Sequence, residues 1–211
     1  MSVPETPKGI AAIRERLGYQ PVLLAVSALL AGAALTWAHG ATKAPIAAAE
    51  ATDLRNTLAQ VIPEGFADND LLADVVEVDG VRGQVRVHVA RRAGAPVGAV
   101  FRMAERGYAG EVALLMAVDA DGRVLGVRVL KHAETPGLGD KIDRAKSPWI
   151  DSFAGKSLAE PVPAQWAVKK DGGVFDAFAG ATITPRAVVK AVRSGLEFFS
   201  AQRAEILGDR S

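Results

Sequence analysis

The chain has 211 residues, 49% of them apolar and 23% charged, and its 25 Lys and Arg nearly balance its 24 Asp and Glu. This balance removes the simplest argument for nucleic-acid binding, which needs a basic excess to neutralise phosphates, and the apolar content excludes wholesale disorder. Cysteine is absent, which excludes disulfides, thiolate metal sites and thioether-linked haem, and the three histidines are too widely spaced to indicate a metal cluster.

A long apolar segment lies near the N-terminus. No Asp, Glu, Lys or Arg occurs between Arg16 and Lys43, and the centre of the segment, 22–38, is almost entirely apolar. Because about 20 such residues cross the hydrocarbon core of a bilayer, we expect a transmembrane helix over 19–39. A buried helix of a soluble protein and a cleaved signal peptide are the alternatives.

The charges beside this segment indicate its orientation. Basic residues are slightly more numerous before the segment than after it, which favours a short cytoplasmic N-terminus at 1–18. Residues 40–211 would then form a single domain outside the cytoplasm.

The rest of the chain predicts helices at both ends with antiparallel strands between them, an α+β fold. An Ala-rich linker at 41–51 overlaps a first helix, and Asp and Gly at 119–122 indicate a hairpin turn between two of the strands. His88 alternates with valines in a strand, so we expect a structural residue that faces solvent or a polar pocket. The expected helices are 47–61 and 185–203, and the expected strands are 84–90, 97–103, 111–118, 123–131 and 165–168.

The first segment that departs from ordinary patterning is HAETPGLGD at 132–140, just past a strand. Pro136 fixes its φ angle, and Gly137 and Gly139 allow backbone geometries and close approaches that a Cβ forbids. A rigid loop of this kind at a strand end can hold a flat ligand. The alternative is a connection that only turns the chain.

The second such segment is DAFAGATITPR at 176–186. Thr184 followed by Pro185 predicts an N-cap and the first residue of the last helix. The N-terminus of a helix favours a phosphate, so a hydroxyl at Thr182 could carry or contact one there. The residues alone identify an anion site without identifying the anion, and a capped turn with no ligand remains the alternative.

Together, these segments resemble a known family. The single N-terminal apolar helix, GYAGEVALLMAVDADGRVLGVRVLKHAETPGLGDKID at 107–143 and FDAFAGATITPRAVVKAV at 175–192 are similar to the G subunit of the Rnf electron-transport complex (RnfG, also called RsxG), a family with an FMN-binding domain. The C subunit of the sodium-pumping NADH:quinone reductase is a more distant relative with similar motifs.

The resemblance implies that FMN is joined covalently to Thr182 by a phosphoester bond. A separate FAD-dependent flavin transferase makes this bond in the family and recognises an upstream acidic residue, here Asp176. The family usually has Ser or Thr where this chain has Ala179, which puts the efficiency of modification in question but leaves the acceptor unchanged. The other residues that the resemblance assigns to cofactor binding are Gly180, Ala181, Thr184, Glu134, Thr135, Gly137 and Leu138.

The resemblance further implies an electron carrier that is not a catalyst alone. It would act with the other members of the Rnf complex in the bacterial inner membrane, where electron transfer between ferredoxin and NAD is coupled to ion translocation, with its flavin domain on the periplasmic side. No nucleic-acid partner and no metal are expected. The alternatives are the C subunit of the sodium-pumping reductase, a membrane-tethered flavin- or anion-binding module without electron transfer, and a structural protein of the complex with an empty site.

Overall fold

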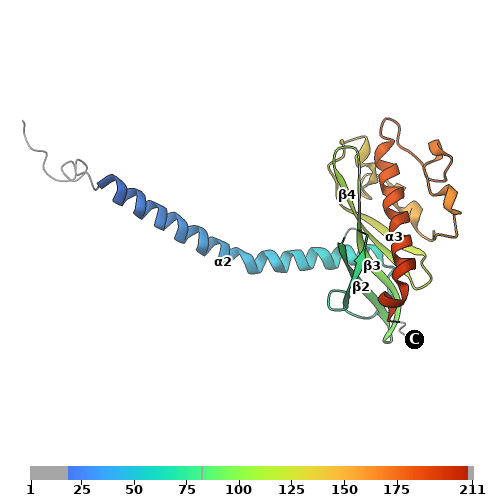
Figure 1. The fold of residues 1–211 in the computed structure, drawn as a ribbon, viewed down its shortest axis with the longest axis horizontal. Coiled ribbons are helices and arrows are strands. Elements are labelled where there is room, and N and C mark those ends of the chain that lie inside the picture. The colour runs from blue at the N-terminus through green and yellow to red at the C-terminus, as the bar shows by residue number, and fades with distance from the viewer. Residues whose placement is uncertain (1–18, 82, 209–211) are drawn as a thin grey trace, which may run out of the picture. The chain divides into compact units, whose positions relative to one another are not determined.

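The computed structural model describes residues 19–81 and 83–208, and the expected cytoplasmic segment 1–18 lies outside them. The main elements, coloured along the chain in Figure 1, are α2 (Tyr19–Val61), β1 (Val75–Gly80), β2 (Gly83–Arg92), β3 (Ala95–Arg106), β4 (Glu111–Asp119), β5 (Val124–Lys131) and α3 (Ile183–Leu207). Between β5 and α3 lie four short 3-10 helices, η1 (Gly139–Ile142), η2 (Pro148–Phe153), η3 (Pro163–Gln165) and η4 (Lys169–Asp171).

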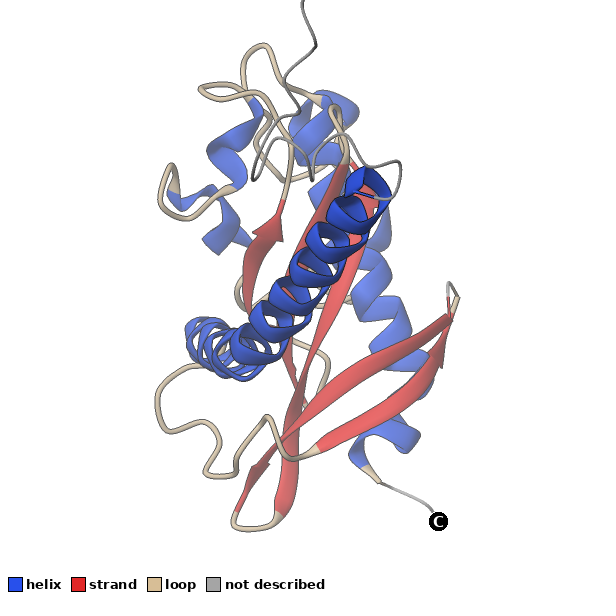
Figure 2. Ribbon diagram, turned by 90° about the vertical axis from the view of Figure 1, so that its left-hand side faces the viewer, coloured by secondary structure: helices blue, strands red, loops and turns tan. Residues whose placement is uncertain are grey.

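The five strands form one antiparallel sheet in chain order, drawn in red in Figure 2. The hairpin at 119–122 is confirmed, since Gly122 adopts a positive φ of 78° in the turn between β4 and β5. The fold is therefore α+β, as the sequence predicts.

The chain divides into two compact units, Met1–Thr52 and Asp53–Ser211. The described part of the first unit is helical, and within it Gln20–Lys43 is long and apolar enough to cross a membrane. The expected break between two helices is wrong, because α2 runs without interruption from Tyr19 to Val61. The Ala-rich composition that indicated a linker is itself favourable to helix.

The second unit contains a sheet that is covered on both faces. The end of α2 places Leu58 and Val61 against one face, in a cluster with Val100, Leu115 and Ala117. Gly126 in β5 makes this contact possible, since a Cβ there would lie 2.6 Å from the Val61 carbonyl oxygen.

The other face of the sheet packs against α3, which lies along β3 and β4 in Figure 1. Phe101 of β3 stacks on Phe199 of α3 with ring centroids 6.5 Å apart. Because β4 has cover on both faces, its residues from Val112 to Val118 are all buried. The packing of α3 along β3 and β4 holds the helix against the sheet.

Four local features differ from the expectations or refine them. Residues 165–168 are not a strand, because Pro163–Gln165 forms η3 and Val168 makes only an isolated bridge with Phe175. The last helix begins at Ile183 rather than at Pro185, and β1 was not expected at all. His88 is structural but only 7% exposed, with its Nδ1 2.8 Å from the Leu71 carbonyl oxygen.

Candidate functional site

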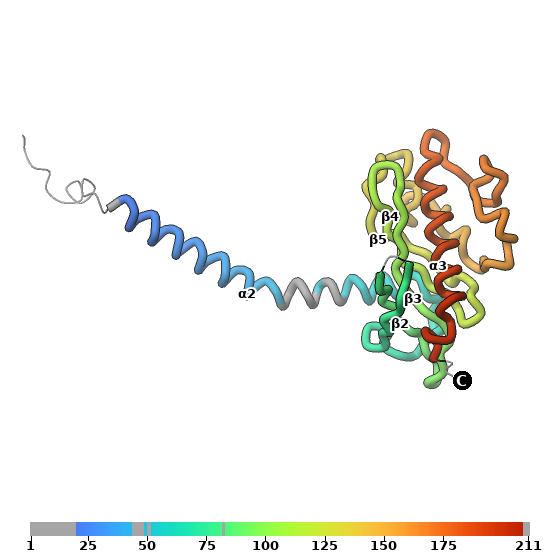
Figure 3. Tube along the Cα trace, in the orientation of Figure 1, coloured from blue at the N-terminus to red at the C-terminus, as the bar shows by residue number. Residues whose placement is uncertain are grey.

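Three segments far apart in the sequence meet around one cavity of about 400 Å³. They are the β3–β4 turn, the loop after β5 and the segment that leads into α3. In the chain trace of Figure 3, the last two are joined by the yellow-to-orange stretch between β5 and α3. The residues that line the cavity are Tyr108, Glu134, Thr135, Leu138, Gly139, Gly180, Ala181, Thr182, Ile183 and Thr184.

The cavity therefore brings together most of the residues that the sequence assigned to cofactor binding. Seven of the eight line it, and Gly137 lies in the same loop without lining it. Sequence reasoning missed Tyr108, Gly139 and Ile183 as lining residues. Tyr108 belongs to the segment GYAG between two strands, where an aromatic residue flanked by glycines was the available signal.

The loop after β5 is folded back on itself. The Thr135 carbonyl oxygen accepts hydrogen bonds from the backbone N–H groups of Leu138 (3.2 Å) and Gly139 (3.1 Å). Gly137 has a φ of 78°, a left-handed conformation that favours glycine. The turn directs the side chain of Leu138, 42% exposed, to the cavity.

Glu134 begins this loop, and its carboxylate is buried, with the residue only 4% exposed. Its Oε1 accepts hydrogen bonds from the backbone N–H groups of Tyr108 (3.0 Å) and Ala109 (3.2 Å). Its Oε2 accepts a hydrogen bond from the Thr184 hydroxyl. The carboxylate is thus engaged by protein donors from both other segments of the site.

The segment before α3 contains a tight turn. The Ala181 N–H donates to the Phe178 carbonyl oxygen (3.1 Å), and Gly180 adopts a φ of 80°, as the third residue of a type II turn requires. The indole N–H of Trp149 anchors the turn by donating to the Asp176 carbonyl oxygen (2.9 Å), and the Trp149 ring packs edge-on against Phe178.

The start of α3 differs from the prediction. Thr182, not Thr184, is the N-cap residue, and its side chain makes no capping hydrogen bond within the described chain. Thr184 lies in the first turn, 1% exposed, where its hydroxyl donates to Glu134. This partner is 50 residues away in the sequence, so local capping rules could not reveal it. The result leaves Thr182 half-buried at the cavity, with a hydroxyl that has no capping role.

The rim of the cavity is apolar and exposed. Tyr108, Leu138 and Ile183 are 68%, 42% and 47% exposed, and all three line the cavity. Exposed apolar side chains that gather at one place indicate a ligand or partner surface. The N–H groups of the first turn of α3 lie at the same place and favour an anion. The site can thus hold a ligand that combines a flat apolar part with a phosphate.

Ion pairs lie close to this site. Asp176 is exposed and pairs with Lys169 at 2.6 Å. Arg186 in α3 donates two hydrogen bonds to the Asp171 carboxylate, at 2.6 and 2.5 Å. This contact lowers the pKa of Asp171 and raises the pKa of Arg186. The Lys169–Asp176 pair closes the segment 169–176 on itself, and the Arg186–Asp171 pair ties that segment to α3.

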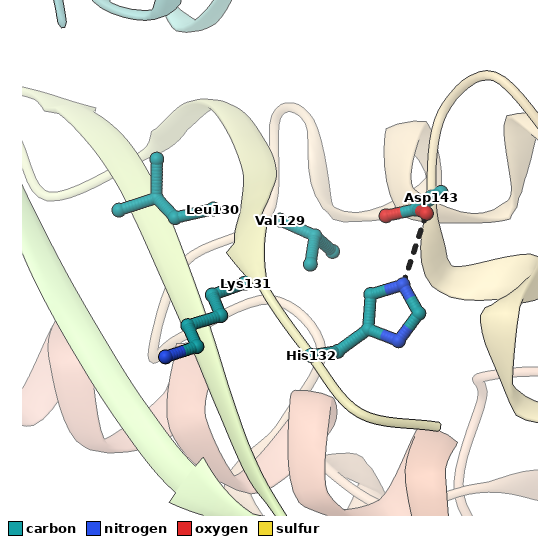
Figure 4. A pocket seen from close by; sticks show the side chains of 5 residues that line it. All are labelled: Val129, Leu130, Lys131, His132 and Asp143. Carbon is teal, nitrogen blue, oxygen red and sulfur yellow. Dashed lines mark hydrogen bonds and ion pairs between the residues drawn. The ribbon is translucent and has the colours of Figure 1, made fainter. Parts of the chain in front are cut away.

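A second hollow, of about 350 Å³, lies beside the start of the loop and is shown in Figure 4. His132 lines it and lies 3.0 Å from the Asp143 carboxylate through Nε2. The other ring nitrogen, Nδ1, accepts a hydrogen bond from the Glu134 N–H at 3.0 Å. The proton of the neutral ring is therefore assigned to Nε2, which donates to Asp143.

Comparison with known proteins supports one family. Residues 107–197 match the model of the FMN-binding domain. The G subunit of the ion-translocating oxidoreductase complex of Cereibacter sphaeroides is 52% identical over 88% of this chain and 85% of its own length. The G subunits of Stutzerimonas stutzeri and Pseudomonas aeruginosa are 48% and 43% identical, over 90% and 93% of this chain and 83% and 95% of their own lengths.

A solved structure is also similar. NqrC of Shewanella oneidensis, 24% identical, superposes with a TM-score of 0.48 over 66% of this chain and 74% of its own. The assignment of the family depends instead on the sequence relatives, which match this chain at high identity across nearly its whole length. The chain belongs to the family of G subunits of the ion-translocating oxidoreductase complex.

Proposed function

We propose that this chain is the electron carrier of an ion-translocating oxidoreductase complex and that it carries FMN on Thr182. The observation on which the proposal depends is the position of Thr182 at the N-cap of α3. The residue lines the cavity, and its hydroxyl makes no capping hydrogen bond in the described chain. The names of the relatives and the match to an FMN-binding domain agree with this reading.

The residues present fit FMN. The cavity of about 400 Å³ has an apolar rim for the ring system, formed by Tyr108, Leu138 and Ile183, and a helix N-terminus for the phosphate. Gly180 adopts a positive φ of 80°, which favours glycine, in the turn that leads to the start of α3. When bound, FMN supplies the redox chemistry, while the protein places the ring and sets its surroundings.

The attachment is a phosphoester bond. The Thr182 Oγ attacks the FMN phosphorus of FAD, the P–O bond to the AMP half breaks, and AMP leaves while the hydroxyl proton is lost to a base of the transferase. The phosphodiester that results keeps one negative charge, which the N-terminus of α3 stabilises by about 0.3–1 kcal/mol. Asp176 is exposed six residues upstream, where the transferase can reach it.

The remaining parts of the proposal concern the membrane and the partners. The expected transmembrane segment 19–39, most of which lies within the long apolar stretch Gln20–Lys43, would cross the inner membrane, with 1–18 in the cytoplasm and the flavin domain, 40–211, on the periplasmic side. Other members of the complex would exchange electrons with ferredoxin and NAD. The chain would receive and pass on electrons at its exposed flavin and would not be a catalyst alone.

The acceptor is tested by substitution in the full-length chain produced with the flavin transferase. Thr182→Ala should abolish flavin fluorescence that stays on the chain in a denaturing gel, whereas Thr184→Ser, which keeps a hydroxyl for Glu134, should retain it. Loss of fluorescence in both variants or in neither would contradict the assignment of Thr182. Fluorescence lost on denaturation of the wild type would indicate a flavin held without a covalent bond.

A further inference from the structure

Glu134 joins the three segments that form the cavity. Its backbone belongs to the loop after β5, its Oε1 accepts from two N–H groups of the β3–β4 turn, and its Oε2 accepts from the Thr184 hydroxyl in α3. Hydrogen bonds to a charged acceptor are roughly twice as strong as neutral ones. Elsewhere the core holds the strands and α3 together, and beside the cavity the Glu134 carboxylate joins the β3–β4 turn to the first turn of α3.

Two glycines show that the backbone is fitted closely to this side chain. A Cβ on Gly107 would overlap Glu134 Oε1, and a Cβ on Gly139 would lie 3.0 Å from Glu134 Cβ and 2.8 Å from Thr184 Oγ1. The backbone approaches the carboxylate from both sides with no space for a larger residue. The contact is therefore a tightly packed junction and not a surface hydrogen bond.

A hydrogen bond to His132 also holds the backbone of Glu134 in place. Its N–H donates to His132 Nδ1, and His132 Nε2 donates to the Asp143 carboxylate, as the dashed line in Figure 4 marks. A chain of hydrogen bonds thus runs from Asp143 through His132 and Glu134 to Thr184, two residues after the proposed attachment point.

We propose that Glu134 is a positioning residue for the flavin site. By tying Thr184 to the β3–β4 turn, it fixes the first turn of α3 and hence the place of the Thr182 hydroxyl relative to the apolar rim. Its buried negative charge beside the cavity also lowers the reduction potential of the bound ring, because adding an electron there is opposed by a like charge. This inference rests on the proposed function, and it differs from the expectation that Glu134 binds the ring directly.

The test compares variants of the full-length chain in detergent, with the wild type, FAD and the flavin transferase present. Glu134→Ala removes the junction, Thr184→Val removes one bond at constant shape, and Glu134→Gln keeps the volume and the carbonyl oxygen while removing the charge. Glu111→Gln is the matched control, because Glu111, the first residue of β4, is exposed and forms an ion pair with Arg102 of β3. The readouts are the rate of covalent flavin incorporation by intact mass and the midpoint potential.

We expect Glu134→Ala and Thr184→Val to slow incorporation at least tenfold at temperatures well below unfolding, since a misplacement of about 1 Å costs about a hundredfold in rate. Glu134→Gln should restore most of the rate and shift the midpoint potential to more positive values, and Glu111→Gln should match the wild type in both. If Glu134→Ala fails to fold, Thr184→Val decides the question.

Wild-type rates in both Glu134→Ala and Thr184→Val, or an unchanged potential in Glu134→Gln, would overturn the inference while leaving the proposed function intact. A wild-type chain that takes up no flavin would instead overturn the proposed function. A merely structural role would lower the melting temperature without changing either the rate or the potential.

Discussion

Gly139→Ala tests how closely the loop after β5 is fitted to α3. The new Cβ would lie 2.8 Å from Thr184 Oγ1, 3.0 Å from Glu134 Cβ and 3.1 Å from Glu134 Oε2. All three atoms belong to buried residues, so relief requires the loop to move away from α3 or the hydrogen bond between Thr184 and Glu134 to break.

The expected magnitude follows from two opposing effects. Overpacking in a buried site costs about 1–3 kcal/mol, and replacing glycine by alanine returns about 0.4–1 kcal/mol by restricting the unfolded chain. The central values leave a net loss in free energy of unfolding of about 1 kcal/mol, which lowers the melting temperature by about 2–4 °C for a domain of this size. Covalent flavin should fall as well, because the displaced atoms line the cavity.

The assay combines thermal unfolding of the full-length chain in detergent with the amount of covalent flavin per chain. Gly155→Ala is the control, because Gly155 has a φ of 78° and open space around its Cβ position. Alanine in this left-handed conformation costs about 1–2 kcal/mol of stability, similar to the loss expected for Gly139→Ala. Because Gly155 does not line the cavity, the flavin content of Gly155→Ala should match that of the wild type. A Gly139→Ala chain with wild-type melting temperature and flavin content would contradict a close fit between the loop after β5 and α3.

Three further predictions concern other parts of the domain. The Arg186 contact depresses the pKa of Asp171 below its ordinary 3.8, so the pair's stabilising effect is fully present above that pH and is lost as the pH falls through the depressed pKa. The melting temperatures of wild type and Asp171→Asn should begin to converge below pH 3.8 and coincide only below the depressed pKa, and a constant gap would contradict this. Leu58→Ala should lower the free energy of unfolding by about 2–5 kcal/mol in denaturant titrations, because Leu58 is 2% exposed against the sheet; a loss below about 1 kcal/mol would argue against that packing. Asp176→Asn, at an exposed ion pair with Lys169, should change stability by less than about 0.5 kcal/mol but reduce covalent flavin, and an unchanged flavin content would remove Asp176 from the recognition motif.

The fold was largely predictable where the pattern was local. The hairpin at 119–122 and the last helix follow from turn residues and from helical patterning, and both are confirmed. β1 was missed, although VVEVDG contains three valines, because a six-residue strand beside a loop has little periodicity to detect. The false strand at 165–168 arose from apolar residues that are buried by aromatic packing, where Trp166 lies against Phe175, and not by a sheet.

The sequence identified most residues of the site, but not the hydrogen bonds that join them. Glycines and a proline indicated the loop after β5, and small residues indicated the turn before α3, because unusual backbone conformations favour particular residue types. The hydrogen bond between Thr184 and Glu134 has no local sequence signal, since it joins residues 50 apart. Local capping rules therefore predicted Thr184 as the N-cap residue, a position that Thr182 occupies. The exposed rim residues became visible only when the three segments were seen together.

The most direct test of the account is the mass of the tryptic peptide 171–186 from chain purified from its native membrane. We expect a peptide heavier by one FMN less one water, with fragmentation placing the added mass on Thr182 rather than on Thr184. The unmodified peptide as the main species, or the added mass on Thr184, would contradict it.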